Sequence, residues 1–193
     1  MSLLLLRRGR IGSARVEGDP PVFHLKSVLE FGGNTPDGRL VHGVAVPWFE
    51  IMKMLQQDPQ SMYQIGYERW EEIIAGAYER AGFDEVILTP RSGDLGRDVI
   101  ASIRGVGSIR IYDQVKAYSP GNLVTANDVR ALLGVITGAR NVSKGVITTT
   151  SAFAPGVATD PFLAPHMPFR LELKDREQLL KWLEELSSGS SSS

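Results

Sequence analysis

Cysteine is absent from all 193 residues of this chain. Its absence excludes disulfide frameworks, thiolate zinc sites and cysteine nucleophiles. Histidine is scarce, because His24, His42 and His166 are the three in the sequence and they lie far apart. Neither a histidine metal cluster nor a histidine-centred catalytic triad has a spacing to support it. Carboxylate, amide and ammonium groups remain the main candidates for chemistry.

Long hydrophobic runs are also missing. The leucines at residues 3–6 form too short a run for a secretory signal, and their positive charges follow the run instead of preceding it. Nothing else approaches the length of a transmembrane helix. We therefore expect residues 3–6 to form a β-strand. We expect the protein to be cytoplasmic, in a reducing compartment, and without contact with a membrane.

Net charge is close to zero, at -1, with 42% hydrophobic and 22% charged residues. This composition is that of an ordinary soluble protein and gives no support to one that coats DNA through a generally basic surface. Residues 86–150 nevertheless carry eight basic and four acidic side chains. A locally positive segment fits a polyanionic substrate, although such an excess also arises readily by chance.

Turn-forming residues divide the chain into three zones. Residues 1–45 hold short apolar runs broken by glycine and proline at 18–21 and 32–38, which predicts a small β-rich extension. This extension either contacts DNA or a neighbouring subunit, or serves as a structural addition, which we consider the better interpretation. Residues 46–186 form the main domain, and the serine- and glycine-rich tail 187–193 is expected to be disordered.

The main domain is predicted to be α/β, because helical and strand periodicities follow one another along it. Pro47 opens a helix with Trp48, Ile51, Met52 and Leu55 inside, and Asp58-Pro59 ends it. The second helix, residues 68–81, buries Trp70, Ile73, Ile74, Ala77, Tyr78 and Ala81 and stops at Gly82. Strands are expected at 85–89, 98–103, 108–118, 145–149 and 169–173, with helices capped by Thr125 and Asp175 in between and at the end.

A charged loop and the strand after it carry the most informative residues. The loop reads Gly93-Asp94-Leu95-Gly96-Arg97-Asp98, and one hairpin later the strand reads Gln114-Val115-Lys116. Because side chains alternate along a strand, Gln114 and Lys116 share a face. Mg²⁺ prefers oxygen ligands and usually takes one or two carboxylates, leaving water and substrate phosphate to complete its shell. Asp98 is the natural first ligand, and Lys116 is suited to hold a phosphate or orient the attacking water.

These residues resemble the Mrr-like branch of the restriction-endonuclease-like (PD-(D/E)XK) nuclease superfamily, whose motif is Asp, then Glu or Gln, one residue, then Lys. The resemblance covers residues 46–186 and includes the Gly-Val-Ile-Thr-Thr-Thr strand. It implies an α-β-β-β-α-β core, a mixed sheet flanked by helices. It also implies a Mg²⁺ site, with Mn²⁺ as a substitute, whose protein ligands are Asp98, the Val115 carbonyl and Glu71.

The remaining assignments have alternatives. Glu71 lies at the edge of the apolar stripe of its helix and directly follows Trp70, as the family glutamate follows its aromatic residue, but it also fits a solvated acid. Asp94 either assists the metal or hydrogen-bonds its own turn, the better interpretation. The hydroxyls at residues 148–151 either bind phosphates or belong to a strand running into a turn.

The sequence therefore predicts a Mg²⁺-dependent endodeoxyribonuclease that restricts foreign or modified DNA, with Asp98, Gln114, Lys116 and Glu71 as catalytic residues. Because one active site cuts one strand, duplex cleavage calls for a homodimer or a larger restriction complex. The alternative is a module with a nuclease fold that binds DNA or a partner protein without cutting. A third possibility is a nuclease directed at RNA.

Overall fold

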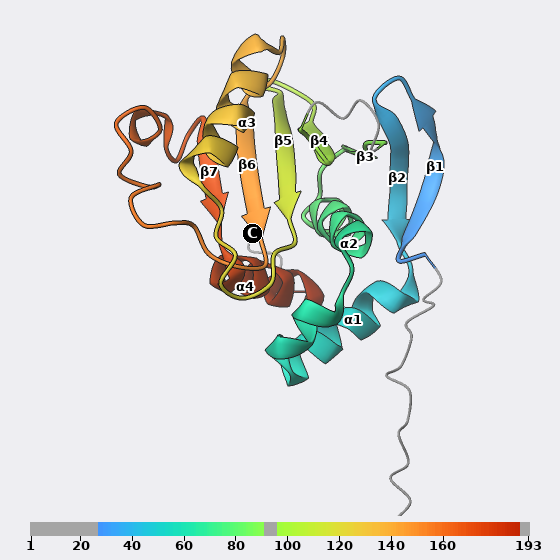
Figure 1. Cartoon of the computed structure of the whole chain (residues 1–193). Helices are drawn as coiled ribbons and strands as arrows, with labels where there is room; N and C mark the ends of the chain where they lie inside the picture. The colour runs from blue at the N-terminus through green and yellow to red at the C-terminus, as the bar shows by residue number, and fades with distance from the viewer. Residues whose placement is uncertain (1–26, 91–95, 190–193) are drawn as a thin grey trace, which may run out of the picture.

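Alternating and helical patterns of apolar residues form seven strands and four α-helices within residues 27–90 and 96–189, which the computed structural model describes (Figure 1). In chain order the elements are β1 (Leu29–Thr35), β2 (Gly38–Val44), α1 (Val46–Gln57), the 3₁₀ helix η1 (Pro59–Gln64), α2 (Tyr67–Arg80), β3 (Glu85–Leu88), β4 (Val99–Ile103), β5 (Ile109–Lys116), α3 (Ala126–Gly138), β6 (Lys144–Thr149), the 3₁₀ helix η2 (Ala164–His166), β7 (Leu171–Lys174) and α4 (Arg176–Ser187).

The strands form one mixed sheet in the order β1-β2-β3-β4-β5-β6-β7. Neighbours from β1 to β5 pair antiparallel, whereas β5, β6 and β7 pair parallel. Parallel pairing of β5 with β6 requires a crossover, which α3 supplies. As a result β5 and β6 end at the same edge of the sheet, and β4, which is antiparallel to β5, begins there. We call this edge the carboxyl edge.

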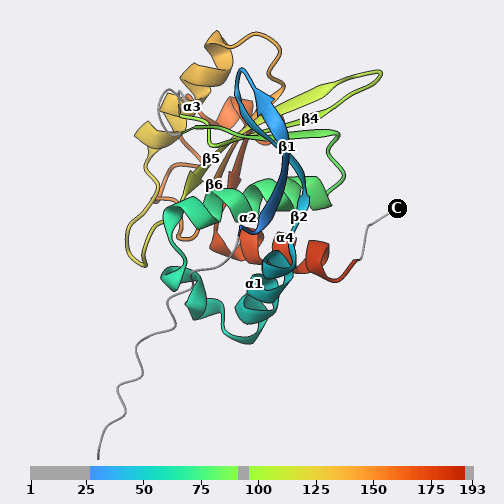
Figure 2. The same ribbon diagram turned by 90° about the vertical axis from the view of Figure 1, so that its right-hand side faces the viewer.

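Helices cover both faces of the sheet. Figure 2 shows α3 on one side and α2 and α4 on the other. Alternation along the central strands supplies both layers: Val99 and Val115 pack in the cluster with α2 and α4, whereas Ile100 and Tyr112 pack in the cluster with α3. The central strands are therefore buried on both faces, as expected where helices cover a sheet.

The predicted core is confirmed. Helix, three strands, helix and strand appear in that order as α2, β3, β4, β5, α3 and β6. Thr125 caps α3 and Asp175 caps α4, each in a reciprocal capping box. The predicted stripe of α1 is buried, and Gly82 follows α2 with a positive φ of 83°.

Several boundaries differ from the predictions. β1 continues through residues 32–35, which were expected to be loop, because two irregularities in its pairing with β2 accommodate the glycines. Phe169 was expected to begin a buried strand, but it is exposed and β7 begins at Leu171. Pro47 is the second residue of α1 and not the first, and Ala81 is an exposed cap residue, because α2 ends at Arg80.

Other predictions fall partly outside the described residues. The strand expected at residues 3–6 and the apolar run at 22–25 lie there, as do residues 190–193 of the tail. Ser187, which the predicted tail included, is the last residue of α4. The predicted division at residue 45 stays a prediction, although β1 and β2 belong to the same sheet as the main domain. None of the helices described is long and apolar enough to cross a membrane.

Helix α2 is held close to α1 by a contact that a glycine permits. The indole nitrogen of the fully buried Trp48 donates a hydrogen bond to the carbonyl oxygen of Ile73, at 3.1 Å. A β-carbon added at Gly76 would lie 2.7 Å from the same nitrogen and 2.9 Å from the side chain of Val44. The absence of a side chain at this buried helix position is therefore a packing requirement.

We predict opposite effects for two glycine-to-alanine substitutions within helices. Gly134→Ala, in α3, places its methyl group where no described atom lies within 4 Å and should raise the free energy of unfolding by about 0.5–1 kcal/mol. Gly76→Ala should lower it by about 1–3 kcal/mol, because overpacking against Trp48 outweighs helix propensity. Urea denaturation of both variants measures the difference, and stabilisation by Gly76→Ala would show that α1 and α2 do not approach as described.

Candidate active site

The central strand β5 sorts its side chains between the two faces of the sheet as predicted. Ile111 and Val115 pack in the cluster under α2 and α4, whereas Tyr112 packs in the cluster under α3. Gln114 and Lys116 alternate with Val115 and are both partly buried. They therefore share the face opposite to Val115, at the carboxyl edge, where β5 ends.

Asp98 is fixed at the point where β4 begins. It is 5% exposed, and its amide donates to the carbonyl oxygen of Asp113 at 2.9 Å. One carboxylate oxygen, Oδ2, accepts a hydrogen bond from the backbone N–H of Val115 at 2.7 Å. The carboxylate predicted to bind the metal is thus attached to the backbone of the residue between Gln114 and Lys116. A bond of this kind, with a charged acceptor, contributes roughly 1.5–3 kcal/mol.

Glu71 reaches the same place from α2. It is 7% exposed, so the alternative of a solvated acid is wrong. The hydroxyl group of Tyr67, at the start of α2, is within hydrogen-bonding reach of both the Glu71 and Asp98 carboxylates. Burial, and then the charges of Asp98 and Glu71, raise the pKa of Tyr67 far above its ordinary value. Tyr67 therefore stays protonated and marks the point where the two carboxylates converge.

Gln114 presents an amide to the loop that precedes β4. A β-carbon added at Gly96 would lie 3.2 Å from Gln114 Nε2, and Gly96 has a φ of 75°, so glycine suits both the space and the backbone there. Within residues 27–90 and 96–189, no donor is hydrogen-bonded to the buried Oε1 of Gln114. Asp94, which we expected to bond its own turn or to assist the metal, lies outside the described residues.

Lys116 extends toward the start of α3. Its Nζ lies 3.8 Å from Oδ1 of Asp128, and the two side chains are 21% and 26% exposed. Burial favours the neutral form of Asp128, but hydrogen bonds from Thr125 and the charge of Lys116 lower its pKa overall. Asp128 completes the capping box of α3, so the partner of Lys116 is itself held rigidly. A partly exposed ammonium group with a fixed partner is suited to contact a phosphate.

The donor set fits a divalent cation of the magnesium type. Among the residues described, no three His, Asp or Glu side chains form a ready-made metal cluster. Mg²⁺ needs only one or two carboxylates, however, and Asp98 and Glu71 converge at Tyr67. The buried Oε1 of Gln114 adds an oxygen without a donor from the described part of the chain. The Val115 carbonyl stays a predicted ligand.

Hydroxyl groups at the end of β6 serve the fold. Thr148, Thr149 and Thr150 are almost completely buried. Their hydroxyls donate, in that order, to the Asp113 carboxylate and to the backbone carbonyls of Lys116 and Tyr118, each at 2.8 Å. These three hydroxyls are therefore occupied within the fold, which favours the alternative in which they are strand residues running into a turn.

A second buried carboxylate, which the sequence did not single out, lies one residue before Gln114. Asp113 is fully buried on the α2 side, where its Oδ2 accepts from the hydroxyls of Tyr78 and Thr148, each at 2.8 Å. Burial raises the pKa of Asp113 to about 6, against the opposing charge of Lys174. Burial likewise lowers the pKa of Lys174, with Asp113 and Glu172 opposing. Asp113, Tyr78 and Thr148 form a buried polar layer beneath β5.

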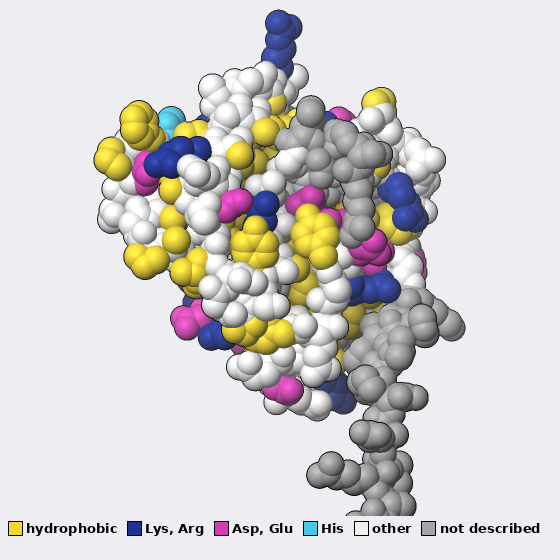
Figure 3. All heavy atoms as spheres, viewed as in Figure 1, with side chains coloured by type: hydrophobic (Ala, Val, Ile, Leu, Met, Phe, Trp, Pro, Cys, Tyr) yellow, Lys and Arg dark blue, Asp and Glu magenta, His cyan; other side chains and the backbone are white. Residues whose placement is uncertain are grey.

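Acidic, basic and apolar side chains lie close together in the middle of the face of the molecule that Figure 3 draws. A hollow of about 370 Å³ lies at the start of α2, lined by Tyr67 and by Gly66, Glu68, Arg69 and Glu72. The starts of α2 and α3 both lie near the carboxyl edge, where Tyr67 reaches Asp98 and Asp128 reaches Lys116. The partial positive charge of helix N-termini favours anions at this edge.

The order of elements is that of an α/β protein with a mixed sheet flanked by helices. A sequence model of the Mrr_cat family, described as restriction endonuclease, matches residues 62–183. The chain belongs to this family. The resemblance inferred from the sequence is thereby confirmed, and the family is one of nucleases that generally use divalent metal ions.

Two solved structures are similar to the chain. One is the MspJI restriction endonuclease in complex with a 27-mer oligonucleotide, at 15% identity and a TM-score of 0.44 over 77% of this chain and 33% of that one. The other is the DNA modification-dependent restriction endonuclease AspBHI, at 19% identity and a TM-score of 0.45 over 78% of this chain and 42% of that one. The chain thus spans less than half of either protein. No curated protein matches it.

The raised pKa of Asp113 predicts that the free energy of unfolding depends on pH. Its folded-state pKa of about 6 lies above the value of an unfolded aspartate, so the folded state holds the proton more tightly. The stability that this proton contributes is present below about pH 4 and is lost as the pH rises through 6. Relative to Asp113→Asn, the unmodified protein should lose about 2–3 kcal/mol between pH 4 and 7. Urea denaturation at several pH values measures this, and a constant difference between the two proteins would contradict it.

Proposed function

We propose that this protein is a Mg²⁺-dependent endonuclease that hydrolyses phosphodiester bonds of DNA, leaving a 5′-phosphate and a 3′-hydroxyl. The observation that carries the proposal is the bond from the Val115 amide to Asp98, which joins the predicted metal ligand to the Gln-x-Lys strand. Membership in a family of restriction endonucleases gives this geometry its chemical context.

Each residue has a role that its position supports. Asp98 and Glu71 would supply carboxylate oxygens to a bound cation, and the single hydroxyl hydrogen of Tyr67 is available to either carboxylate. When bound, the metal acidifies a water molecule for in-line attack on phosphorus. Lys116 stabilises the charge that spreads over the phosphate oxygens, and Asp128 orients it. Gln114 presents an amide where many related sites have a carboxylate, so the site carries one negative charge fewer and binds metal more weakly before DNA arrives.

We further propose a role in the restriction of foreign or modified DNA, in the cytoplasm. A single site cuts one strand, so we infer that duplex cleavage uses a homodimer or a larger restriction complex. The alternative, a module that binds DNA or a partner protein without cutting, leaves the grouping of Asp98, Gln114 and Lys116 without a physical use.

The direct test is cleavage of supercoiled plasmid by the purified protein with Mg²⁺ or Mn²⁺. Nicked or linear products should form and should disappear with EDTA. Lys116→Ala should reduce the rate by about 10²–10⁴-fold, because the charge that balances the phosphate is lost.

Lys144→Ala is the matched control. Lys144 is also a strand lysine in one ion pair, with Glu172 at 2.9 Å, and its side chain is 26% exposed. This variant should cut like the unmodified protein. Undiminished cleavage by Lys116→Ala would refute the assigned role, and DNA binding without products under any divalent ion would favour the non-cleaving module. Digestion of RNA under the same conditions shows whether the substrate is DNA or RNA.

A further inference from the structure

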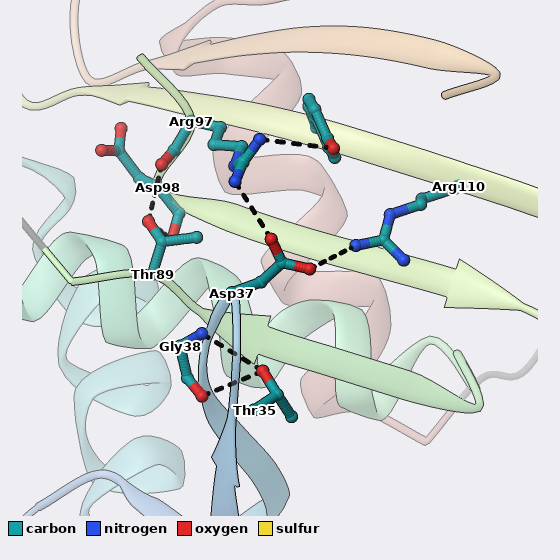
Figure 4. Close-up of polar contacts among 8 residues, drawn as sticks. Thr35, Asp37, Gly38, Thr89, Arg97, Asp98 and Arg110 are labelled. Carbon is teal, nitrogen blue, oxygen red and sulfur yellow. Dashed lines mark hydrogen bonds and ion pairs between the residues drawn. The ribbon is translucent and has the colours of Figure 1, made fainter. Parts of the chain in front are cut away.

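The turn of the β1–β2 hairpin carries an aspartate that joins two arginines of the nuclease core. Asp37 Oδ1 lies 3.1 Å from Nη2 of Arg97, and its Oδ2 lies 2.9 Å from Nη2 of Arg110 (Figure 4). Arg97 immediately precedes Asp98, and Arg110 lies on β5. One carboxylate from the N-terminal hairpin thus connects the segment that holds Asp98 with the strand that holds Gln114 and Lys116.

Arg97 is held through both its side chain and its backbone carbonyl group. Its side chain is 15% exposed, its guanidinium group lies 4.9 Å from the centre of the Tyr112 ring, and Nη1 donates to the Tyr112 hydroxyl at 3.4 Å. Its carbonyl oxygen accepts from the hydroxyl of Thr89 at 2.6 Å. A residue held in this way limits the positions open to Asp98, its neighbour in the chain.

A second tie runs through the backbone of the same turn. Gly38 has a φ of 150°, and a β-carbon added there would lie 2.3 Å from the carbonyl oxygen of Leu88 and 2.9 Å from Cα of Thr89. The backbone of the turn is therefore in close contact with the backbone at the end of β3. Thr89 in turn donates its N–H to the carbonyl oxygen of Asp98 at 3.0 Å. The hairpin reaches Asp98 by two routes, through Arg97 and through Thr89.

The negative charge of Asp37 also affects the metal site. Arg97 belongs to the segment that carries Asp98, Arg110 lies on the neighbouring strand β5, and Asp37 is the carboxylate that both guanidinium groups contact. Without Asp37, their positive charge would be less compensated near a site that must attract a cation. Orientation and charge therefore both predict that loss of Asp37 weakens metal binding.

We propose that Asp37 is a positioning residue for the metal site and that the β1–β2 hairpin is a working part of the nuclease. Asp37 acts through Arg97 on the orientation of Asp98. This inference rests on the proposed function, since it assumes that Asp98 binds a divalent cation.

The test is Mn²⁺ binding to the full chain, measured by isothermal titration calorimetry without DNA. Asp37→Asn keeps the shape of the side chain and removes its charge, and it should weaken Mn²⁺ binding roughly tenfold. The Mn²⁺ concentration needed for half-maximal plasmid cleavage should rise in the same proportion. Asp37→Glu, which restores the charge, should recover part of the loss.

Glu172→Gln is the matched control, because it removes one carboxylate from a strand-to-strand ion pair of similar exposure. It should bind Mn²⁺ like the unmodified protein. Suppose that Asp37→Asn melts at a lower temperature but binds Mn²⁺ with unchanged affinity. Asp37 would then have only a structural role, and the inference would be overturned. If Asp37→Asn does not fold, Arg97→Lys keeps the charge and loses the planar fork, and unchanged binding in that variant overturns the inference equally.

The two proposals fail separately. An unmodified protein that binds Mn²⁺ but does not cut DNA overturns the proposed function, and the binding titration still decides the role of Asp37. An unmodified protein that cuts DNA while Asp37→Asn matches it in both binding and cleavage overturns the role of Asp37 alone.

Discussion

The hydrogen bond from the Val115 amide to the Asp98 carboxylate is the interaction on which the site depends. A carboxylate at the start of β4 would ordinarily be solvated and free to rotate, but this one is buried and accepts from the neighbouring strand. The bond fixes Asp98 relative to Gln114 and Lys116, which flank Val115. The antiparallel pairing of β4 with β5, continued by the parallel pairing of β5 with β6, creates the carboxyl edge where this contact is possible.

The site draws on both helix layers. Tyr67 and Glu71 come from α2, on one face of the sheet, and Asp128 comes from α3, on the other. The carboxylates gather with Tyr67, whereas Lys116 pairs with Asp128. Separate placement of the anionic and cationic groups suits a reaction in which one part of the site binds a cation and another balances the charge of a phosphate. The buried layer of Asp113, Tyr78 and Thr148 supports β5 from beneath.

Local patterns in the sequence were sufficient to predict the core of the fold and the face shared by Gln114 and Lys116. Periodicity identified α2, β5 and α3, because burial on a helix or strand follows its repeat. Burial of Glu71 was only partly foreseeable, since its edge position fits solvent and interior alike. Tyr67 lies one helical turn before Glu71, a spacing that places both on one side of α2. Asp37 carried no local signal, because its partners Arg97 and Arg110 are distant in sequence and only the sheet order β1-β2-β3-β4-β5 brings them together.

Anomalous diffraction from crystals soaked in Mn²⁺ tests the central claim most directly, because it locates the cation independently of any activity. The account predicts an ordered Mn²⁺ peak between the carboxylates of Asp98 and Glu71, with Tyr67 beside it. An ordered peak elsewhere on the chain, with none near Asp98 at a saturating concentration of Mn²⁺, would contradict it.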